Sequence, residues 1–206
     1  MKQEAFYAWL TPELETIFRA IPFETRNWLD VGCGSGTLGA LARVSRRIDF
    51  SVGLDVWSDY LRFCKDRNLY DKVIKWNLNF GLPNFDRHFD VATCIDVVEH
   101  LKKNAGNRLL SELVDIADVV IVTTPNVFCK NDCPDGNTFQ THLSVWEKKD
   151  FVRLGFTVYG FGFFKIFNRE VKKLSFLLSP ICRIPKFSQH ATRLFAVYDR
   201  HGIVKL

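Results

Sequence analysis

The sequence lacks the features that mark membrane-spanning, secreted and low-complexity proteins. No apolar run among its 206 residues approaches the roughly 20 that cross a bilayer. The N-terminus, with Glu4 and an early Pro12, lacks the basic-then-apolar layout of a signal peptide. Neither an internal repeat nor a low-complexity segment is present. With 47% hydrophobic and 25% charged residues, the chain is expected to form a single domain over residues 1–206, located in the cytoplasm.

The cysteines lack the spacing of a metal site. Several lie in predicted strands or in a glycine-rich loop, where small buried thiols are common, so all are expected to be reduced. The six are Cys33, Cys64, Cys94, Cys129, Cys133 and Cys182. Cys129 and Cys133, with His142 downstream, form the one suggestive group, but four ligands at tighter spacing are usual. The sequence therefore predicts no metal.

Charge is unevenly distributed along the chain. Residues 165–206 contain nine basic and two acidic residues, whereas the rest contains 19 basic and 21 acidic ones. The net charge of +5 therefore belongs to the C-terminal part.

Predicted strands and helices alternate. A helix over about residues 11–20 precedes seven strands, and further helices follow the first, second, fourth and fifth of them. The strands are expected at 27–31, 50–55, 72–76, 89–95, 118–124, 156–161 and 192–199, and the other helices at about 37–46, 58–67, 104–115 and 144–155, the last opened by a capping box of Ser144 and Glu147. This order implies an α/β domain with a mostly parallel sheet, whose ligands bind at the carboxyl ends of the strands.

The stretch DVGCGSGTLG, from Asp30 to Gly39, fits two glycine motifs. Read from Gly34 it is the G-x-G-x-x-G of dinucleotide-binding enzymes, and read from Asp30 it is the D-x-G-x-G-x-G of methyltransferases. A pyrophosphate on this loop would be repelled by Asp30, because like charges about 4 Å apart cost about 4 kcal/mol at a surface-like dielectric. A cationic, phosphate-free ligand such as S-adenosylmethionine would be attracted.

The order and spacing of the motifs resemble the class I S-adenosylmethionine-dependent methyltransferases. The stretches that carry the resemblance are WLDVGCGSGTLG, VGLDVW, FDVATCIDVVEHL, VVIVTTPN and DGNTFQTHLSVWEKKDFVRLGFTVYG. The resemblance implies a doubly wound, mostly parallel, seven-stranded Rossmann-like sheet with helices on both faces and an antiparallel last strand. It also implies methyl transfer from S-adenosylmethionine by in-line displacement.

The resemblance further implies a set of cofactor-binding residues. Asp30 would lie near the ammonium of the cofactor, and Gly32, Gly34 and Gly36 would approach its methionine and ribose parts. Asp55 would bind the ribose hydroxyls. The adenine would meet Val56, Trp57, Asn77 and Leu78, and the methionine end would meet Ile95 and Asp96. Asn77 replaces the usual aspartate, but its amide oxygen can accept the same hydrogen bond.

Catalysis by in-line displacement needs alignment first and a base second. Glu99, His100 and His142 are the candidates for a base that activates a hydroxyl acceptor. Alternatively, His100 packs against or caps the next helix, and His142 only makes loop hydrogen bonds.

A basic, aromatic-rich insertion at about 162–191 separates the last two predicted strands. Its segment 163–186 suits either a helical lid over the acceptor pocket or a peripheral membrane contact. Both interpretations fit a small-molecule, sugar-type or lipid-like acceptor. A nucleic-acid acceptor is disfavoured, because no RNA-binding appendage is present and IDVVEH replaces the Asn-Pro-Pro-Tyr type motif of base-methylating enzymes. No motif indicates an oligomeric state.

Three functions compete at this point. The leading one is a methyltransferase, the second is a cofactor-binding or membrane-peripheral module that has lost turnover, and the third is a dehydrogenase. The first two functions predict binding of S-adenosylhomocysteine, whereas the dehydrogenase predicts binding of NAD, so a comparison of the two ligands separates them.

Overall fold

A computed structural model describes residues 12–45, 48–127, 136–166, 169–170, 180–181 and 183–204 of the chain. Its helices are α2 (Pro12–Ala20), α3 (Thr37–Ser45), α4 (Ser58–Asp66), α5 (Lys103–Ile116) and α6 (Lys148–Val152). Its strands are β1 (Asn27–Val31), β2 (Phe50–Asp55), β3 (Lys72–Lys75), β4 (Phe89–Ile95), β5 (Ala117–Pro125), β6 (Thr157–Ile166), β7 (Arg169–Glu170) and β8 (Ala191–Asp199). Four short 3-10 turns complete them: η1 (Leu78–Phe80), η2 (Val98–His100), η3 (Thr138–Gln140) and η4 (Pro185–His190).

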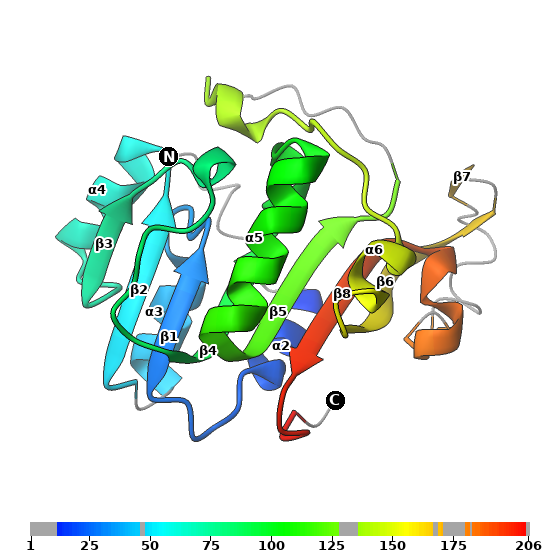
Figure 1. Cartoon of the computed structure of the whole chain (residues 1–206), viewed down its shortest axis with the longest axis horizontal. Helices are drawn as coiled ribbons and strands as arrows, with labels where there is room; N and C mark the ends of the chain where they lie inside the picture. Colours follow the sequence, from blue (N-terminus) through cyan, green and yellow to red (C-terminus); the bar gives the residue numbers. More distant parts are fainter. Residues whose placement is uncertain are drawn as a thin grey trace.

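The strands form one sheet in the order β3-β2-β1-β4-β5-β8-β6-β7 (Figure 1). Strands β1 to β5 pair in parallel, and β8 pairs antiparallel with both β5 and β6. The chain therefore starts in the middle of the sheet, builds outward to β3, and then continues from β4 on the other side. This confirms the predicted doubly wound sheet with an antiparallel last strand.

Two features of the sheet were not predicted. Strand β6 continues to Ile166, past a register shift between Phe161 and Phe164. Gly162, with φ 78°, lies inside that shift, and a glycine with positive φ is what one class of β-bulge requires. The two-residue β7 then adds an eighth strand within the basic insertion. It was not predicted because the sequence there shows no alternation of polar and apolar residues.

Two hydrophobic cores cover the two faces of the sheet. In β5, Val119 and Ile121 pack with the buried residues of α2, α3 and α4, whereas Val120 and Val122 pack with those of α5 and α6. Because side chains alternate along a strand, the continuous apolar run 119–122 serves both cores. Figure 1 shows α5 in front of the sheet and α2 and α3 behind it.

The start of the last predicted helix was wrong. Helix α6 begins at Lys148, after Glu147, and the Glu147 amide donates to Asp150 Oδ2 over 2.8 Å. Ser144 instead donates from its hydroxyl to the Val98 carbonyl. Its oxygen also accepts from the buried indole of Trp146, which needs a polar partner. These bonds hold Ser144 in the preceding loop.

The predictions about membrane spans and about the cysteines can be compared only with the described residues. No helix among them is long and apolar enough to cross a bilayer. Cys33, Cys64 and Cys94 are buried free thiols, as predicted, while Cys129, Cys133 and Cys182 lie outside the described residues.

Candidate active site

The glycine loop joins β1 to α3 at the carboxyl edge of the parallel strands. Gly32, Gly34 and Gly36 have φ values of 69°, 52° and 80°, a region that residues with a Cβ rarely adopt. A Cβ on Gly32 would lie 2.3 Å from Cγ2 of Val97, so the loop packs directly on the segment that follows β4. A Cβ on Gly34 would meet no atom within 4 Å, which leaves open space in front of the loop for a ligand.

Asp55 is tied to this loop at the end of β2. Its Oδ2 accepts from the Gly34 amide over 2.9 Å, and its Oδ1 accepts from the Trp57 amide over 2.8 Å. Burial raises the pKa of the carboxyl group, and hydrogen bonds from the backbone amides of Trp57, Gly34 and Val56 oppose that rise. The two bonds fix a carboxylate beside the open space at Gly34, where the sequence places the ribose hydroxyls.

Asp30 lies beneath the loop and is only 3% exposed. The Tyr70 hydroxyl donates to its Oδ2 over 2.5 Å, and the Thr93 hydroxyl donates to its Oδ1 over 2.7 Å. The Trp28 indole in turn donates to the Thr93 oxygen over 3.0 Å. Burial raises the pKa of Asp30 to about 6. Asp30 is therefore a buried carboxyl group that is hydrogen-bonded beneath the loop. Its contact with a cofactor ammonium stays a prediction.

Tyr70 is a residue of this site that the sequence analysis missed. Added Cβ atoms at Gly39 and Gly53 would lie 2.6 and 2.7 Å from carbons of its ring. Gly39, the last glycine of the G-x-G-x-x-G pattern, is therefore small because Tyr70 packs against α3 there. The sequence gives no local sign of this contact, since the ring comes from 31 positions further along the chain.

On the expected adenine side of the site, the side chain of Asn77 already makes hydrogen bonds within the protein. Asn77 Oδ1 accepts from both the backbone amide and the side-chain amide of Asn79, each over 3.0 Å. These two bonds use both lone pairs of the oxygen, so the acceptor assigned to Asn77 is already occupied. Val56 and Trp57 remain half-buried, and Leu78 is buried at the start of η1.

Ile95 and Asp96 follow at the end of β4. Both are half-buried, and Asp96 adopts a φ of 55°, which is uncommon for a residue with a side chain. The Thr123 hydroxyl donates to Asp96 Oδ1 over 2.8 Å. Arg193, on the antiparallel strand β8, donates to both carboxylate oxygens. Arg193 was also missed, because nothing near it in the sequence links the last strand to this edge.

The three predicted base candidates come together just beyond Asp96. Each of Glu99, His100 and His142 offers a side-chain nitrogen or oxygen, and these atoms all lie within 4.8 Å of one another. The two imidazole rings are 4.8 Å apart between centroids, with an edge-on arrangement. Residues 42 positions apart in the sequence therefore share one cluster, here called the Glu-His-His cluster.

Backbone hydrogen bonds hold the loop of His142 against this segment. The amides of Leu143 and Ser144 both donate to the Glu99 carbonyl, over 2.7 and 3.0 Å. On the histidine side, His100 Nδ1 lies 3.3 Å from the Thr141 carbonyl. That carbonyl can only accept, so the contact favours a proton on Nδ1 and leaves Nε2 without one.

Burial shifts the pKa values within the cluster in opposite directions. Glu99 is 2% exposed, and burial, reinforced by the Asp96 charge, raises its pKa to about 8. The Thr124 hydroxyl donates to its Oε2 over 3.0 Å. Burial also lowers the pKa of His100, which keeps that imidazole neutral near pH 7. Of the two, His100 is the better proton acceptor, and Glu99 is the better donor.

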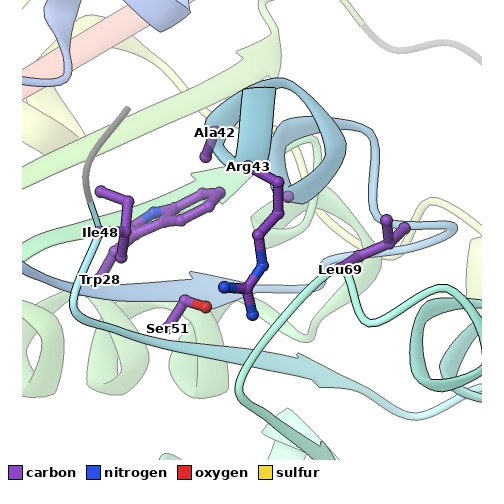
Figure 2. Close-up of a pocket in the computed structure, with 7 residues that line it drawn as sticks. Trp28, Ala42, Arg43, Ile48, Ser51 and Leu69 are labelled. Carbon is purple, nitrogen blue, oxygen red and sulfur yellow. The ribbon is translucent and has the colours of Figure 1, made fainter. Parts of the chain in front are cut away.

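A cavity of about 80 Å³ lies elsewhere, between α3 and the sheet. Figure 2 shows Trp28 and Ile48 on one side of it and Leu69 on the other, with Arg43 reaching across toward Ser51. Trp28 and Ser51 pair with each other near the amino ends of β1 and β2, away from the glycine loop. Small-molecule sites usually measure a few hundred Å³, so this cavity does not hold the cofactor.

Half of the predicted membrane-contact segment, 163–186, lies outside the described residues. Its described end leads into η4, where Phe187 is 37% exposed, and Ile184, just before η4, is 51% exposed. Lys148 of α6 donates to the Pro185 carbonyl over 2.7 Å. Nothing in the described part of the segment supports contact with a membrane.

The family assignment follows from the first two thirds of the chain. The family described as methionine biosynthesis protein MetW matches residues 11–131, which is more than half of the chain and includes the glycine loop, Asp55 and η2. This chain belongs to the MetW family. The matched residues end before η3 and His142, so they include Glu99 and His100 but not the third member of the Glu-His-His cluster.

Similar proteins of known structure or function agree with this fold. The chain is 31% identical over 77 residues to the mitochondrial ubiquinone biosynthesis O-methyltransferase of Saccharomyces cerevisiae, a match to 35% of the chain and 24% of that enzyme. It therefore spans only about a quarter of the length of this curated relative. A structure described as a SAM-dependent methyltransferase from Archaeoglobus fulgidus superposes with a TM-score of 0.59, at 18% identity, over 95% of this chain and 99% of that one.

A third similarity is to a nucleic-acid enzyme. The structure described as small RNA methyltransferase HEN1 superposes with a TM-score of 0.58, at 17% identity, over 93% of this chain and 26% of that one. At such identities the superpositions establish the fold alone. The fold is that of the class I S-adenosylmethionine-dependent methyltransferases, as the resemblance predicted.

Proposed function

We propose that this protein is an enzyme that transfers a methyl group from S-adenosylmethionine to an oxygen of a small-molecule, sugar-type or lipid-like acceptor. One observation carries the proposal: the glycine loop, with Asp55 fixed beside it, packs through Gly32 on Val97, two residues before Glu99. A nucleoside site and an acid-base cluster thus adjoin at one edge of the sheet.

The residues around the loop fit this cofactor. Gly34 leaves open the space that a side chain would fill, and Asp55 presents a fixed carboxylate that can accept hydrogen bonds from ribose hydroxyls. Asp30 places negative charge under the same loop, which favours a cationic, phosphate-free ligand. When bound, S-adenosylmethionine supplies an electrophilic methyl group on a sulfonium, which becomes a neutral thioether once an acceptor oxygen takes the methyl.

The Glu-His-His cluster would handle the proton of the acceptor hydroxyl. His100 is neutral near pH 7 and has Nδ1 directed at the Thr141 carbonyl, so Nε2 is the atom that would accept the proton. Thr124 and the two amides on the Glu99 carbonyl hold the rest of the cluster in place. Alignment at this edge would supply most of the rate, and the base would add to it.

Calorimetry with S-adenosylhomocysteine tests the cofactor assignment. We expect the wild type to bind it, and Asp55→Asn to bind at least about tenfold more weakly, the loss typical of a charged hydrogen-bond acceptor. Asp59→Asn is the matched control, because Asp59 is an exposed carboxylate near the start of α4 and forms an ion pair with Arg62 of the same helix. Folded wild-type protein that does not bind, or equal binding by the two variants, would overturn the assignment.

Transfer of labelled methyl groups tests the acceptor class. Hydroxylated small molecules, a lipid extract and RNA would be offered in parallel to the wild type and to His100→Asn. Label in the first two pools that falls with His100→Asn supports the proposal. Label confined to RNA would show a nucleic-acid enzyme. Cofactor binding without transfer to any pool would favour the alternative of a binding module.

A further inference from the structure

We propose that the Glu-His-His cluster binds one divalent transition-metal ion, with open coordination positions for the acceptor oxygen. The proposal rests on the proposed function for the role of the ion, but not for the site itself. Two imidazole nitrogens and one carboxylate oxygen within 4.8 Å of one another form the ligand set. Two histidines and one carboxylate are a common set in catalytic zinc and non-haem iron sites.

The ligand atoms are close enough to converge on one ion. Metal-nitrogen and metal-oxygen distances of about 2.1 Å place neighbouring ligand atoms about 3.0 to 3.4 Å apart. The two histidines are only half-buried, so their side chains can make the inward shift from 4.8 Å. Glu99, in contrast, is held in the interior by Thr124, and it would be the fixed member of the set.

Supporting contacts already orient two of the three ligands. Metal-bound histidines usually donate their other ring N–H to a carbonyl or carboxylate, which fixes the tautomer. The Thr141 carbonyl lies 3.3 Å from His100 Nδ1 in that role, which leaves Nε2 as the nitrogen that would bind the ion. The Thr124 hydroxyl takes the corresponding role for the carboxylate of Glu99.

Charge also favours a cation at this position. Glu99 is 2% exposed, its carboxyl group accepts a hydrogen bond from Thr124, and the nearby Arg193 forms its ion pair with Asp96 instead. Ionising a buried carboxyl group that has no directly bound cation is costly, and a divalent ion would supply that cation. Asp96 is not counted as a ligand, because Arg193 and Thr123 already occupy its oxygens.

Three protein ligands leave further positions for an oxygen of the acceptor. An ion there would act as a Lewis acid and lower the pKa of a coordinated hydroxyl group. Because His100 is then a ligand and no longer the base, the hydroxyl gives its proton to water. It keeps the electron pair that an oxygen needs to take a methyl group. The acceptor would accordingly be a molecule whose hydroxyl group can coordinate the ion.

Direct metal binding tests the site without any acceptor. The full chain, freed of metal with a chelator, would be titrated with Zn²⁺ by calorimetry and with Co²⁺ by visible absorption, and with Mg²⁺ as a harder ion. We expect one Zn²⁺ or Co²⁺ per chain and at least about tenfold weaker binding in His100→Asn and in His142→Asn. These two histidines are chosen because Glu99→Gln changes a buried side chain.

Matched controls exclude binding elsewhere in the chain. His88 and His201 both contact Asp118 at the opposite edge of the sheet, and the double variant H88N/H201N should bind the ion like the wild type. C129S/C133S should do the same, which tests the cysteine pair that the sequence suggested. Absence of binding by the wild type, full binding by His142→Asn, or loss of binding in either control would overturn the site.

S-adenosylhomocysteine binding separates this proposal from the proposed function. His142→Asn should still bind S-adenosylhomocysteine like the wild type, which also shows that the variant is folded. If the wild type binds the ion but not S-adenosylhomocysteine, the metal site stands and the proposed function fails. If it binds S-adenosylhomocysteine but no ion, the reverse holds, and His100 acts as an ordinary base.

Discussion

The guanidinium of Arg193 lies 2.5 Å from both carboxylate oxygens of Asp96. Arg193 comes from β8, where it faces Pro125 of β5, and Asp96 forms the turn after β4 with φ 55°. The pair therefore ties the antiparallel end of the sheet to the edge where β4 and β5 deliver the candidate site. It also neutralises a carboxylate next to the Glu-His-His cluster.

A double-mutant cycle of Arg193→Gln and Asp96→Asn should give a coupling of no more than about 1 kcal/mol in the free energy of unfolding. Both side chains are about a third exposed, at 31% and 39%, so solvent screens the pair. Urea unfolding measures the coupling, and added salt should reduce it further. A coupling of several kcal/mol that does not respond to salt would show that the pair behaves as a buried one.

Gly39→Ala should lower the free energy of unfolding by roughly 1–3 kcal/mol, the usual cost of overpacking. The new methyl group would stand 2.6 Å from Cζ of Tyr70 and 3.0 Å from the Leu69 carbonyl, and neither can retreat easily. Val44→Ala on the same helix is the control, because Val44 is 89% exposed and should change little. Equal stability of Gly39→Ala and the wild type would mean that Tyr70 can move away.

The titration of Asp30 should lower the free energy of unfolding as the pH rises from the pKa of Asp30 in the unfolded chain to its pKa in the folded protein. Its pKa is near 3.8 when unfolded and about 6 when folded, so the native state holds the proton more tightly within that range. By linkage, the folded state then binds more protons than the unfolded state, and the free energy of unfolding falls with pH. The full difference is worth roughly 3 kcal/mol.

Chemical denaturation of the wild type and Asp30→Asn between about pH 4 and pH 7 isolates this contribution. Asparagine resembles the protonated acid and can still accept from Tyr70 or Thr93, so the two proteins should be most alike at low pH. The neighbouring Asp55 and Cys33 are present in both, and their titrations largely cancel. A stability difference that does not change with pH would contradict the burial of Asp30.

Lys103→Met should destabilise the contact between α5 and α6 by about 1–3 kcal/mol. The ammonium of Lys103 lies 2.6 Å from Asp150 Oδ2, 2.7 Å from the Val145 carbonyl, and 3.8 Å above the ring of Trp146. Its removal would leave Asp150, which is largely buried, without its cation. Lys102→Met, at an exposed neighbouring position, should stay within about 0.5 kcal/mol of the wild type in thermal or urea unfolding.

Local sequence features suffice to predict most of the sheet and the glycine loop with Asp55. An apolar run, a glycine and a carboxylate at the end of a strand can each be recognised within a few residues. Features of this kind predict strands 27–31, 50–55 and 89–95 and the positions of Gly32, Gly34 and Asp55. A short, nearly continuous apolar run bounded by turn residues predicts a buried strand without any knowledge of tertiary contacts.

The contacts between distant side chains depend on how the strands are arranged in the folded sheet. Tyr70 against Asp30, Arg193 against Asp96, and His142 beside Glu99 join positions 40, 97 and 43 apart, and no local pattern marks any of these pairs. The carboxyl ends of β4 and β5 lie at one edge of the sheet, and the antiparallel β8 begins at that edge, where Arg193 pairs with Pro125. Tyr70 instead reaches Asp30 from the segment that precedes β3.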